Sequence, residues 1–350
     1  MARFHTLKIQ SIVRQTKKAI SITFLVPSSL KSEFVFKSGQ YVTLKTMIDG
    51  IEVRRDYSLS SSPKSGDLTV TVKEIENGLF STYANKVLKP GHTLEVGTPN
   101  GRFIYEPQIA KKSSIVAFAA GSGITPIMSI IQTTLCANTD NEFVLIYGNK
   151  SPEKTIFYNE LLDLQDRNSG RFKIQFVYSE WDEEGAIFGR INTASINYIL
   201  KNNFQLNNSQ LFYLCGPEEM IKTTSDLLSK NGVQDDHILF ELFTSSNIPQ
   251  DKSAVSDGMS EITLIVDDEK TTLLMNQSQT VLEVALENDI DAPYSCQGGV
   301  CSSCICRVTE GSAIMRQNNI LTDSEVNEGL VLSCQAEPTS SIIKVDFDDI

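Results

Sequence analysis

Histidine is scarce in this chain, with three among 350 residues: His5, His92 and His237. They lie far apart, and none is near a cysteine. Two-histidine, one-carboxylate iron sites, histidine-rich zinc sites and Rieske centres each need imidazoles that the fold can bring together. The scattered histidines therefore argue against all three kinds of metal site.

Long apolar runs are also missing. The longest, such as 115–120 and 127–131, fall far short of the roughly 18–20 residues that a membrane span needs. The first residues, MARFHTLKIQ, do not combine a charged start with a following apolar stretch, so they predict no signal peptide. We expect a cytoplasmic chain without a membrane partner, in which a disulfide framework would be out of place.

Excess positive charge is absent too, because the formal net charge is −12. A polyanion would be repelled, so nucleic acid is not an expected partner. The imbalance is local: residues 261–350 hold 16 of the acidic and 4 of the basic residues, whereas residues 1–260 hold 27 of each sign. We infer that the last 90 residues form a separate module with its own partner.

The pattern of apolar and turn-forming residues divides the chain into successive parts. Up to about residue 105, short β-branched segments alternate with Gly, Pro, Asn and Ser clusters, a pattern typical of a small antiparallel barrel. One helix, 81–88, interrupts it, with Ser81 as its expected cap. Residues 110–245 alternate apolar strands with helical stretches, which predicts a parallel sheet covered on both faces. The predicted divisions are 1–107, 108–246, a polar linker at 247–260, and 261–350.

The cysteines carry the strongest motif, Cys296-x4-Cys301-x2-Cys304-x29-Cys334. Four thiolates at this plant-type ferredoxin spacing suit a [2Fe–2S] cluster, with Gly298 and Gly299 giving the loop its tight turns. The alternative is structural zinc, which usually shows two separated C-x2-C pairs, whereas here the fourth cysteine stands alone. We expect Cys306 to be a buried small residue on a strand rather than a redox group.

Two weaker patterns fit a flavin. Arg55, Tyr57 and Ser58 lie on one expected strand and could supply a cation for a phosphate, a flat ring and a hydroxyl. The alternative is that they are ordinary strand formers. Farther on, the segment 78–81, Gly-Leu-Phe-Ser, opens the predicted helix, whose first amides could bind a pyrophosphate or merely be capped.

Two further turns follow predicted parallel strands. The segment 121–126, Gly-Ser-Gly-Ile-Thr-Pro, joins a strand to a helix and resembles a phosphate-binding turn. The segment 215–217, Cys-Gly-Pro, ends another strand, where ligands of such sheets bind. By itself, Cys215 fits a buried core residue equally well.

Taken in order and ending in Phe240-Glu-Leu-Phe243, these motifs resemble the ferredoxin–NADP⁺ reductase superfamily. With its C-terminal ferredoxin-type module, the whole chain is similar to reductase components of multicomponent oxygenases, especially those of phenylacetyl-CoA epoxidases. The resemblance implies a multi-domain fold: an antiparallel flavin-binding β-barrel, an α/β nucleotide domain with a parallel sheet, and an α+β ferredoxin-like (β-grasp) domain.

The resemblance also implies roles for matching residues. Arg55 would bind the flavin phosphate, Tyr57 would stack on the ring, and Ser58 would lie near its N5. The acidic Glu241 and the thiol of Cys215 would lie where hydride moves. The remaining cofactor-binding candidates are Leu59, Gly78, Leu79, Phe80, Ser81, Gly121, Gly123, Thr125, Pro126, Gly216 and Pro217, and the metal ligands are Cys296, Cys301, Cys304 and Cys334.

The activity so implied passes electrons from NAD(P)H through FAD, or less favourably FMN, and a [2Fe–2S] cluster to a partner oxygenase. Alternatives are a reductase for another one-electron acceptor protein, such as a hydroxylamine- or nitric-oxide-handling partner, and a redox sensor. The choice between NADH and NADPH stays open. Relatives that bind a 2′-phosphate often place Arg where this chain has Glu180, yet Lys150 and Lys154 lie close in sequence.

Overall fold

The computed structural model describes residues 3–107, 112–202, 210–243 and 258–350. They belong to two compact units, one spanning Phe4–Phe243 and the other containing the C-terminal residues. The first unit has two parts, which we call the barrel lobe (4–107) and the parallel-sheet lobe (112–243). The predicted boundary at 107/108 lies at the edge of a segment outside the described residues. The boundary at 246/247 and residues 247–257 of the predicted linker lie outside the described residues as well.

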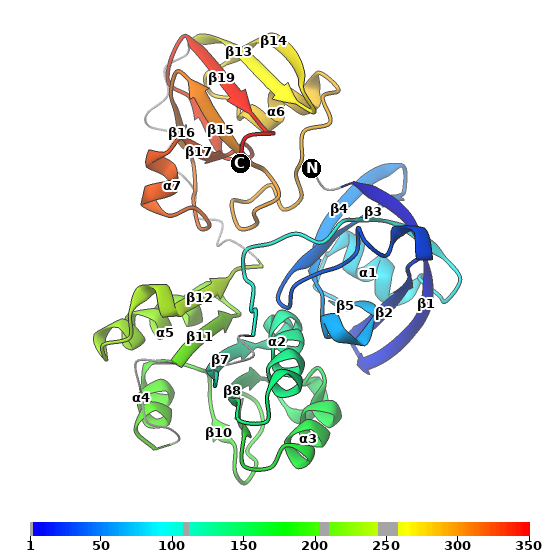
Figure 1. Ribbon diagram of the computed structural model, residues 1–350, viewed down its shortest axis with the longest axis vertical. Coiled ribbons are helices and arrows are strands. Elements are labelled where there is room, and N and C mark those ends of the chain that lie inside the picture. The colour runs from blue at the N-terminus through cyan, green and yellow to red at the C-terminus, as the bar shows by residue number, and fades with distance from the viewer. Residues whose placement is uncertain (1–2, 108–111, 203–209, 244–257) are drawn as a thin grey trace. The chain divides into compact units, whose positions relative to one another are not determined.

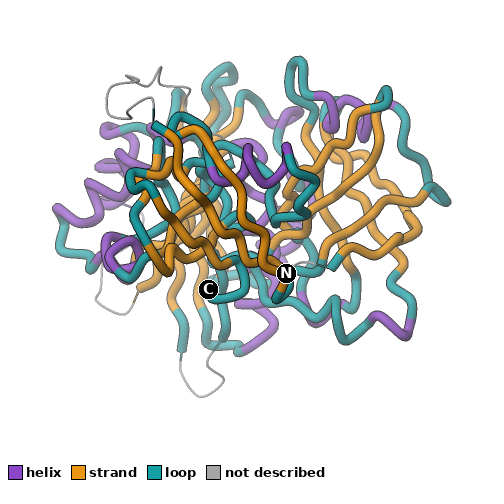
Figure 2. The backbone as a smooth tube through the Cα atoms, turned by 90° about the horizontal axis from the view of Figure 1, so that it is seen from above, coloured by secondary structure: helices purple, strands orange, loops and turns teal. Residues whose placement is uncertain are grey.

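The barrel lobe is one antiparallel sheet of order β4-β3-β6-β1-β2-β5, which curls until Leu59 at one end bridges Val70 at the other (Figure 2). Alternating apolar residues point inward, and Leu7, Val42 and Val96 are fully buried there. The elements are β1 (Phe4–Thr16), β2 (Ala19–Leu25), β3 (Tyr41–Ile48), β4 (Ile51–Ser58), β5 (Leu68–Lys73), α1 (Leu79–Lys86) and β6 (Thr93–Gly97).

The parallel-sheet lobe has six parallel strands in the order β10-β9-β8-β7-β11-β12. Figure 1 shows α2 and α3 on one side of this sheet and α4 and α5 on the other. The strand order reverses between β7 and β11, the position at which open α/β sheets bind ligands. The elements are β7 (Ser114–Ala120), α2 (Ile124–Ala137), β8 (Glu142–Asn149), α3 (Tyr158–Arg167), β9 (Phe172–Tyr178), β10 (Ile187–Phe188), α4 (Thr193–Asn202), β11 (Gln210–Cys215), α5 (Glu218–Lys230) and β12 (Ile238–Glu241).

Hydrogen bonds join the two lobes of this unit. The hydroxyl of Ser129 on α2 donates to the Ser61 carbonyl at 2.6 Å. The phenol of Tyr213 on β11 donates to the Ile104 carbonyl at 3.0 Å. These bonds hold the carboxyl ends of β7 and β11 near the barrel lobe, so residues from both lobes can contribute to one site.

The C-terminal unit has a mixed five-stranded sheet of order β14-β13-β19-β15-β17, in which β13 and β19 run parallel. Helix α6 begins with a capping box formed by Thr280 and Glu283, and it buries Val281 and Val284 in the core of the unit. The elements are β13 (Met259–Val266), β14 (Glu269–Asn276), α6 (Val281–Glu287), β15 (Ile305–Glu310), β16 (Ala313–Met315), α7 (Asp323–Asn327), β17 (Leu330–Leu332), β18 (Ala336–Pro338) and β19 (Ile342–Asp346).

The three-part fold expected from the sequence is confirmed, with two local corrections. Helix α1 begins at Leu79, so Ser81 lies inside its first turn and does not cap it. The last residues of the predicted linker, Met259 and Ser260, belong to β13, whose pairing with β14 includes them. Among the described helices, none is long and apolar enough to span a membrane.

Candidate functional site

A hydroxyl from the barrel lobe and a carboxyl from the parallel-sheet lobe form a hydrogen bond with each other. Ser58 ends β4, and its Oγ donates to Oε2 of Glu241 at the end of β12, at 3.2 Å. Burial raises the pKa of Glu241 to about 8. A carboxyl with that pKa is largely protonated at neutral pH and can hold or release a proton near physiological pH.

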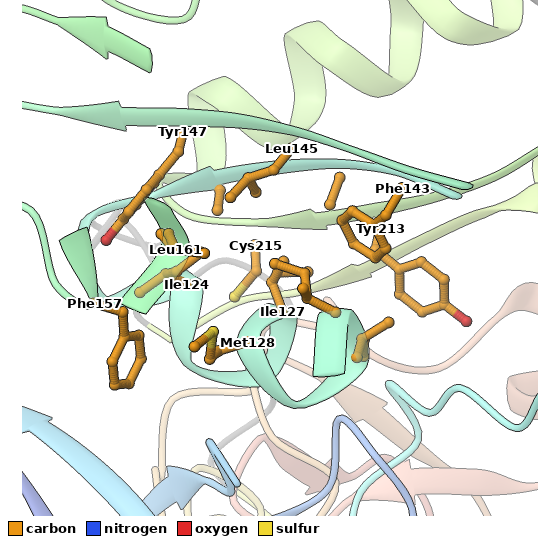
Figure 3. Close-up of a cluster of buried hydrophobic side chains, with 14 of the residues drawn as sticks. Ile124, Ile127, Met128, Phe143, Leu145, Tyr147, Phe157, Leu161, Tyr213 and Cys215 are labelled. Carbon is orange, nitrogen blue, oxygen red and sulfur yellow. The ribbon is translucent and has the colours of Figure 1, made fainter. Parts of the chain in front are cut away.

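Cys215 lies beside this carboxyl. In the parallel pairing it is level with Glu241 on β12 and with Ala119 on β7. Its side chain has no exposed surface, and it lies between the sheet and α2 among Ile124, Ile127 and Met128 (Figure 3). Burial, followed by the nearby Glu241 charge, raises the pKa of its thiol, so the group is a neutral thiol at neutral pH.

The strand β4 also carries the predicted ring-stacking residue. The Tyr57 ring packs against Phe80 with their centroids 5.4 Å apart, and burial raises the Tyr57 pKa, which keeps the phenol neutral. Arg55 is exposed and, among the described residues, has no acidic ion-pair partner, so its charge is available to an anion. Leu59 is different, because its side chain is fully buried in the barrel core and its amide bonds the Gln40 carbonyl. We therefore leave Leu59 out of the proposed site.

The turn at Gly78 shapes the start of α1. No side chain caps this helix, and Gly78 is its N-cap residue. A Cβ there would lie 2.4 Å from both the Ser81 hydroxyl and an Ile75 carbon, so a larger residue would collide with this turn. Ser81 itself accepts the Ile75 amide and donates to the Gly78 carbonyl, which braces the turn. The side chain of Leu79 is exposed and that of Phe80 is buried, so Phe80 could contact a ligand only through its backbone.

The Gly-Ser-Gly turn packs directly against the end of β11. A Cβ on Gly123 would lie 2.0 Å from the Cys215 carbonyl oxygen, so any side chain there would separate the two segments. The Thr125 hydroxyl donates to the Ser122 carbonyl within the turn, and Tyr147 donates to the Gly121 carbonyl at 2.9 Å. The turn is thus fixed at the reversal of strand order, with Pro126 in the first turn of α2.

The same packing extends to the next predicted turn. A Cβ on Gly216 would lie 3.2 Å from the Ala120 amide nitrogen, and Pro217 is the N-cap residue of α5. The two glycine-containing turns, 121–126 and 215–217, are therefore neighbours in space, although about 90 residues separate them in sequence.

The structure adds Lys73, which sequence reasoning did not select. A Cβ on Gly121 would lie 3.0 Å from the Lys73 ammonium, so a cation from the barrel lobe reaches the glycine turn. Burial, then the Lys150 and Lys18 charges, lower the Lys73 pKa. The signal for Lys73 in the sequence is a basic residue at the end of a strand, which is too common to be informative.

Glu180 lies between two lysines. Its carboxylate oxygens are 2.8 Å from the Lys150 ammonium and 2.9 Å from that of Lys154. Hydrogen bonds from these two lysines lower the Glu180 pKa to about 2. The three side chains carry a net positive charge, whereas Glu180 viewed alone suggests a negative site.

The four motif cysteines lie in one region of the C-terminal unit. The sulfurs of Cys304 and Cys334 are 3.3 Å apart, and the Gly298 amide donates to the Cys296 sulfur at 3.4 Å. The loop turns at Gln297 and Gly299, whose φ angles are 53° and 69°, whereas Gly298 has no positive φ. Of the two glycines expected to give the loop its tight turns, Gly299 has a left-handed backbone, and Gly298 brings its amide to a cysteine sulfur.

The surroundings of these sulfurs fit a two-iron cluster. Among the described residues, no three His, Cys, Asp or Glu side chains converge on one ion, but a cluster of two irons needs two cysteines for each iron. Three buried polar atoms near this loop have no protein partner within the part of the chain that the structure describes. The hydroxyls of Ser295 and Ser333 are next in sequence to predicted ligands, and the side-chain nitrogen of Asn319 belongs to a residue whose backbone amide donates to the Gly299 carbonyl. Such donors could bond the sulfides of a cluster. The fifth cysteine, Cys306, is fully buried on β15 with its thiol toward the Val331 carbonyl, as expected of a core residue.

Comparison with known families finds a match for each part of the chain. Residues 7–105 match the oxidoreductase FAD-binding domain, 118–226 the oxidoreductase NAD-binding domain, and 264–339 the 2Fe-2S iron-sulfur cluster binding domain. A 1,2-phenylacetyl-CoA epoxidase subunit from Escherichia coli strain K12 is 37% identical over 99% of this chain and 99% of its own length. The chain belongs to the ferredoxin–NADP⁺ reductase superfamily.

Two further proteins are similar to this chain over nearly their full length. The ferredoxin reductase component of 3-ketosteroid-9-alpha-monooxygenase from Rhodococcus rhodochrous is 31% identical, covering 97% of this chain and 96% of its own. The structure of phthalate dioxygenase reductase has the same fold, with a TM-score of 0.62, 24% identity and 98% of each chain covered. The present chain is therefore an NAD(P)H-dependent oxidoreductase that uses FAD and a [2Fe–2S] cluster to pass electrons to an oxygenase.

Proposed function

We propose that this chain is the reductase component of an oxygenase of the phenylacetyl-CoA epoxidase type and that it works in the cytoplasm. Support for the acceptor comes from the full-length similarity to the epoxidase component of Escherichia coli. Support for the hydride site comes from the Ser58–Glu241 hydrogen bond, which brings together groups from two lobes beside Cys215.

We assign the flavin to the end of β4 and the start of α1. When bound there, FAD would supply the chemistry of accepting a hydride from NAD(P)H and releasing single electrons. Tyr57 would cover the ring, Arg55 would pair with the phosphate, and the uncapped first turn of α1 would donate amides to the pyrophosphate. Ser58 would hold Glu241 toward the flavin edge, and the protonated carboxyl could donate a proton there.

We assign the dinucleotide to the two glycine turns and three cations. The amides of 121–125 and the half-buried Lys73 would bind the pyrophosphate. The positive Lys150–Glu180–Lys154 group would meet the adenosine end. Because a 2′-phosphate adds negative charge at that end, we propose that NADPH is preferred over NADH.

The cofactor preference can be tested with a double variant, Lys150→Ala/Lys154→Ala. We expect kcat/KM for NADPH to fall at least about tenfold, the effect of losing roughly one charge-assisted bond, while kcat/KM for NADH changes little. Glu180→Gln is the matched control and should retain the preference for NADPH. An unchanged NADPH-to-NADH ratio in the double variant would refute the assignment.

The acceptor can be tested by reconstitution. The reductase is mixed with NADPH, oxygen, phenylacetyl-CoA and the oxygenase component of a phenylacetyl-CoA epoxidase, and epoxide formation is measured. Turnover that requires the reductase supports the proposal. Fast reduction of an artificial dye without epoxide would show an active reductase for another acceptor protein, and absence of both would favour a redox sensor.

A further inference from the structure

Gln335 is held firmly beside the cysteine site. It follows Cys334 directly and is 8% exposed. Its backbone amide donates to the Leu332 carbonyl, and its carbonyl accepts the Arg316 amide, each at 2.8 Å. These two bonds fix the backbone of Gln335 beside the cysteine.

That side chain points back to the cysteine loop. Its amide nitrogen lies 3.1 Å from the Gln297 carbonyl and 3.6 Å from the Cys334 sulfur. A primary amide has two N–H groups, so it can donate to both acceptors at once. The side chain passes over Gly299, where a Cβ would lie 3.1 Å from the Gln335 Cγ, so the glycine leaves room for it.

We propose that Gln335 is a positioning residue that raises the reduction potential of the cluster through its hydrogen bond to Cys334. This inference rests on the proposed ligand set. When a cluster gains an electron, negative charge builds on its sulfurs, and an N–H bond to a ligand sulfur becomes stronger. A donor at this position therefore stabilises the reduced form more than the oxidised form.

The same amide joins segments that are distant in the sequence. Gln297 follows the first predicted ligand, Cys296, and Cys334 is the last, yet one side chain contacts both segments. A neutral amide does this without adding charge to a unit that is already acidic. Gln335 thus has two separable effects, one on the potential and one on the geometry of the loop.

The test is a redox titration of the full-length holoprotein in which electron paramagnetic resonance follows the reduced cluster. Gln335→Met keeps the length of the side chain and removes both N–H donors. We expect a more negative midpoint potential for the cluster. At a fixed solution potential, the ratio of reduced to oxidised cluster should fall about three- to tenfold, which corresponds to the free energy of one hydrogen bond. The flavin midpoint should not move, because the flavin site belongs to the other unit.

The matched control is Gln277→Met. Gln277 is 9% exposed in the same unit, and its amide donates to the Ser260 hydroxyl instead of a cysteine. This variant should keep the wild-type cluster potential. An iron-loaded Gln335→Met protein with an unshifted potential would overturn the inference.

Should Gln335→Met fail to hold iron, a second measurement decides. The double variant Gln297→Ala/Gln317→Ala removes two other glutamine side chains and keeps Gln335. This protein is labelled with ¹⁵N in its remaining glutamine side chains, and its cluster is reduced. Pulsed resonance should show a side-chain nitrogen coupled to the cluster, and absence of this coupling refutes the inference. A Cys334→Ala protein that keeps an unaltered cluster would instead refute the proposed ligand set.

Discussion

The two units of this reductase hold their cofactors in different ways. In the C-terminal unit the predicted ligands are four side chains of one type, all between residues 296 and 334. In the larger unit the proposed contacts extend from Arg55 to Glu241 and include many backbone amides. An iron-sulfur cluster is bound by particular cysteine side chains, so the spacing of those cysteines can be recognised in the sequence. A dinucleotide is bound largely by turns and helix ends, which many sequences can form.

The units also differ in charge. The larger one is close to neutral, and the net charge of the chain lies in residues 261–350. Electrons leave from the part that holds the cluster, so its surface must approach the acceptor. The four predictions below test the contrast between the units, starting with the largest expected effect.

Loss of one predicted ligand should empty the C-terminal site and leave the other unit unaffected. Cys301→Ala should abolish bound iron and its visible absorption, because the remaining thiolates cannot complete the cluster. Flavin content should stay at the wild-type level. Cys306→Ala is the control, since Cys306 is a buried core thiol, and iron loss in that protein would show that the ligand set is wrong.

In the larger unit, a single methyl group on a glycine should have the next largest effect. Gly123→Ala would place a Cβ 2.0 Å from the Cys215 carbonyl oxygen and push the two turns apart. We expect kcat/KM for NADPH to fall by about 100-fold, as for a misplacement of about 1 Å. Gly185→Ala is the control for a general loss of stability, because Gly185 has open space around it but a φ of 85° at which a side chain strains the backbone. Equal activity of both variants would contradict the close packing of this site.

Glu241→Gln should change the pH dependence of stability. The Glu241 pKa is about 8 in the folded protein and about 4.5 when unfolded, so the native state binds the extra proton between these values. Its contribution is complete below about pH 4.5 and is lost as pH rises through 8.

Thermal unfolding at pH 6 and pH 9, with FAD in excess, measures this effect. The wild type should lose more stability over this interval than Glu241→Gln. Glu142→Gln, which changes an exposed carboxylate paired with Lys112, should behave as the wild type does. Identical slopes for all three proteins would show that Glu241 does not titrate in this range.

The last prediction concerns association with the acceptor, where the gain from charge is already partly screened at 0.1 M salt. An acidic surface steers a basic partner and speeds encounter by about 10- to 1,000-fold at low salt. Stopped-flow reduction of the oxygenase component should therefore slow as salt rises, since the Debye length falls from about 10 Å at 0.1 M to about 3 Å at 1 M. Flavin-to-cluster transfer is the internal control. A flat salt series for the acceptor would leave solubility as the role of the acidic residues.

The fold could be predicted from the sequence because the spacing of apolar residues differs between the antiparallel and the parallel sheet. The strand Phe172–Tyr178 begins and ends where its apolar run does. The predicted start of α1 was wrong. Serine is a common capping residue, but Ser81 lies in the first turn of the helix, where its hydroxyl donates to the Gly78 carbonyl. The burial of Leu59 could not be predicted, because it depends on how the barrel closes.

The sequence by itself determined the order of the three parts, the cysteine spacing and the location of the acidic charge, because each depends on residues close along the chain. Tertiary structure alone brought Ser58 to Glu241, Lys73 to Gly121 and the Gln335 amide to the Cys334 sulfur. It also placed Glu180 between Lys150 and Lys154, so that these three side chains together carry a net positive charge. These contacts join segments whose separation in space is set by strand order and lobe packing, and no local pattern encodes that separation.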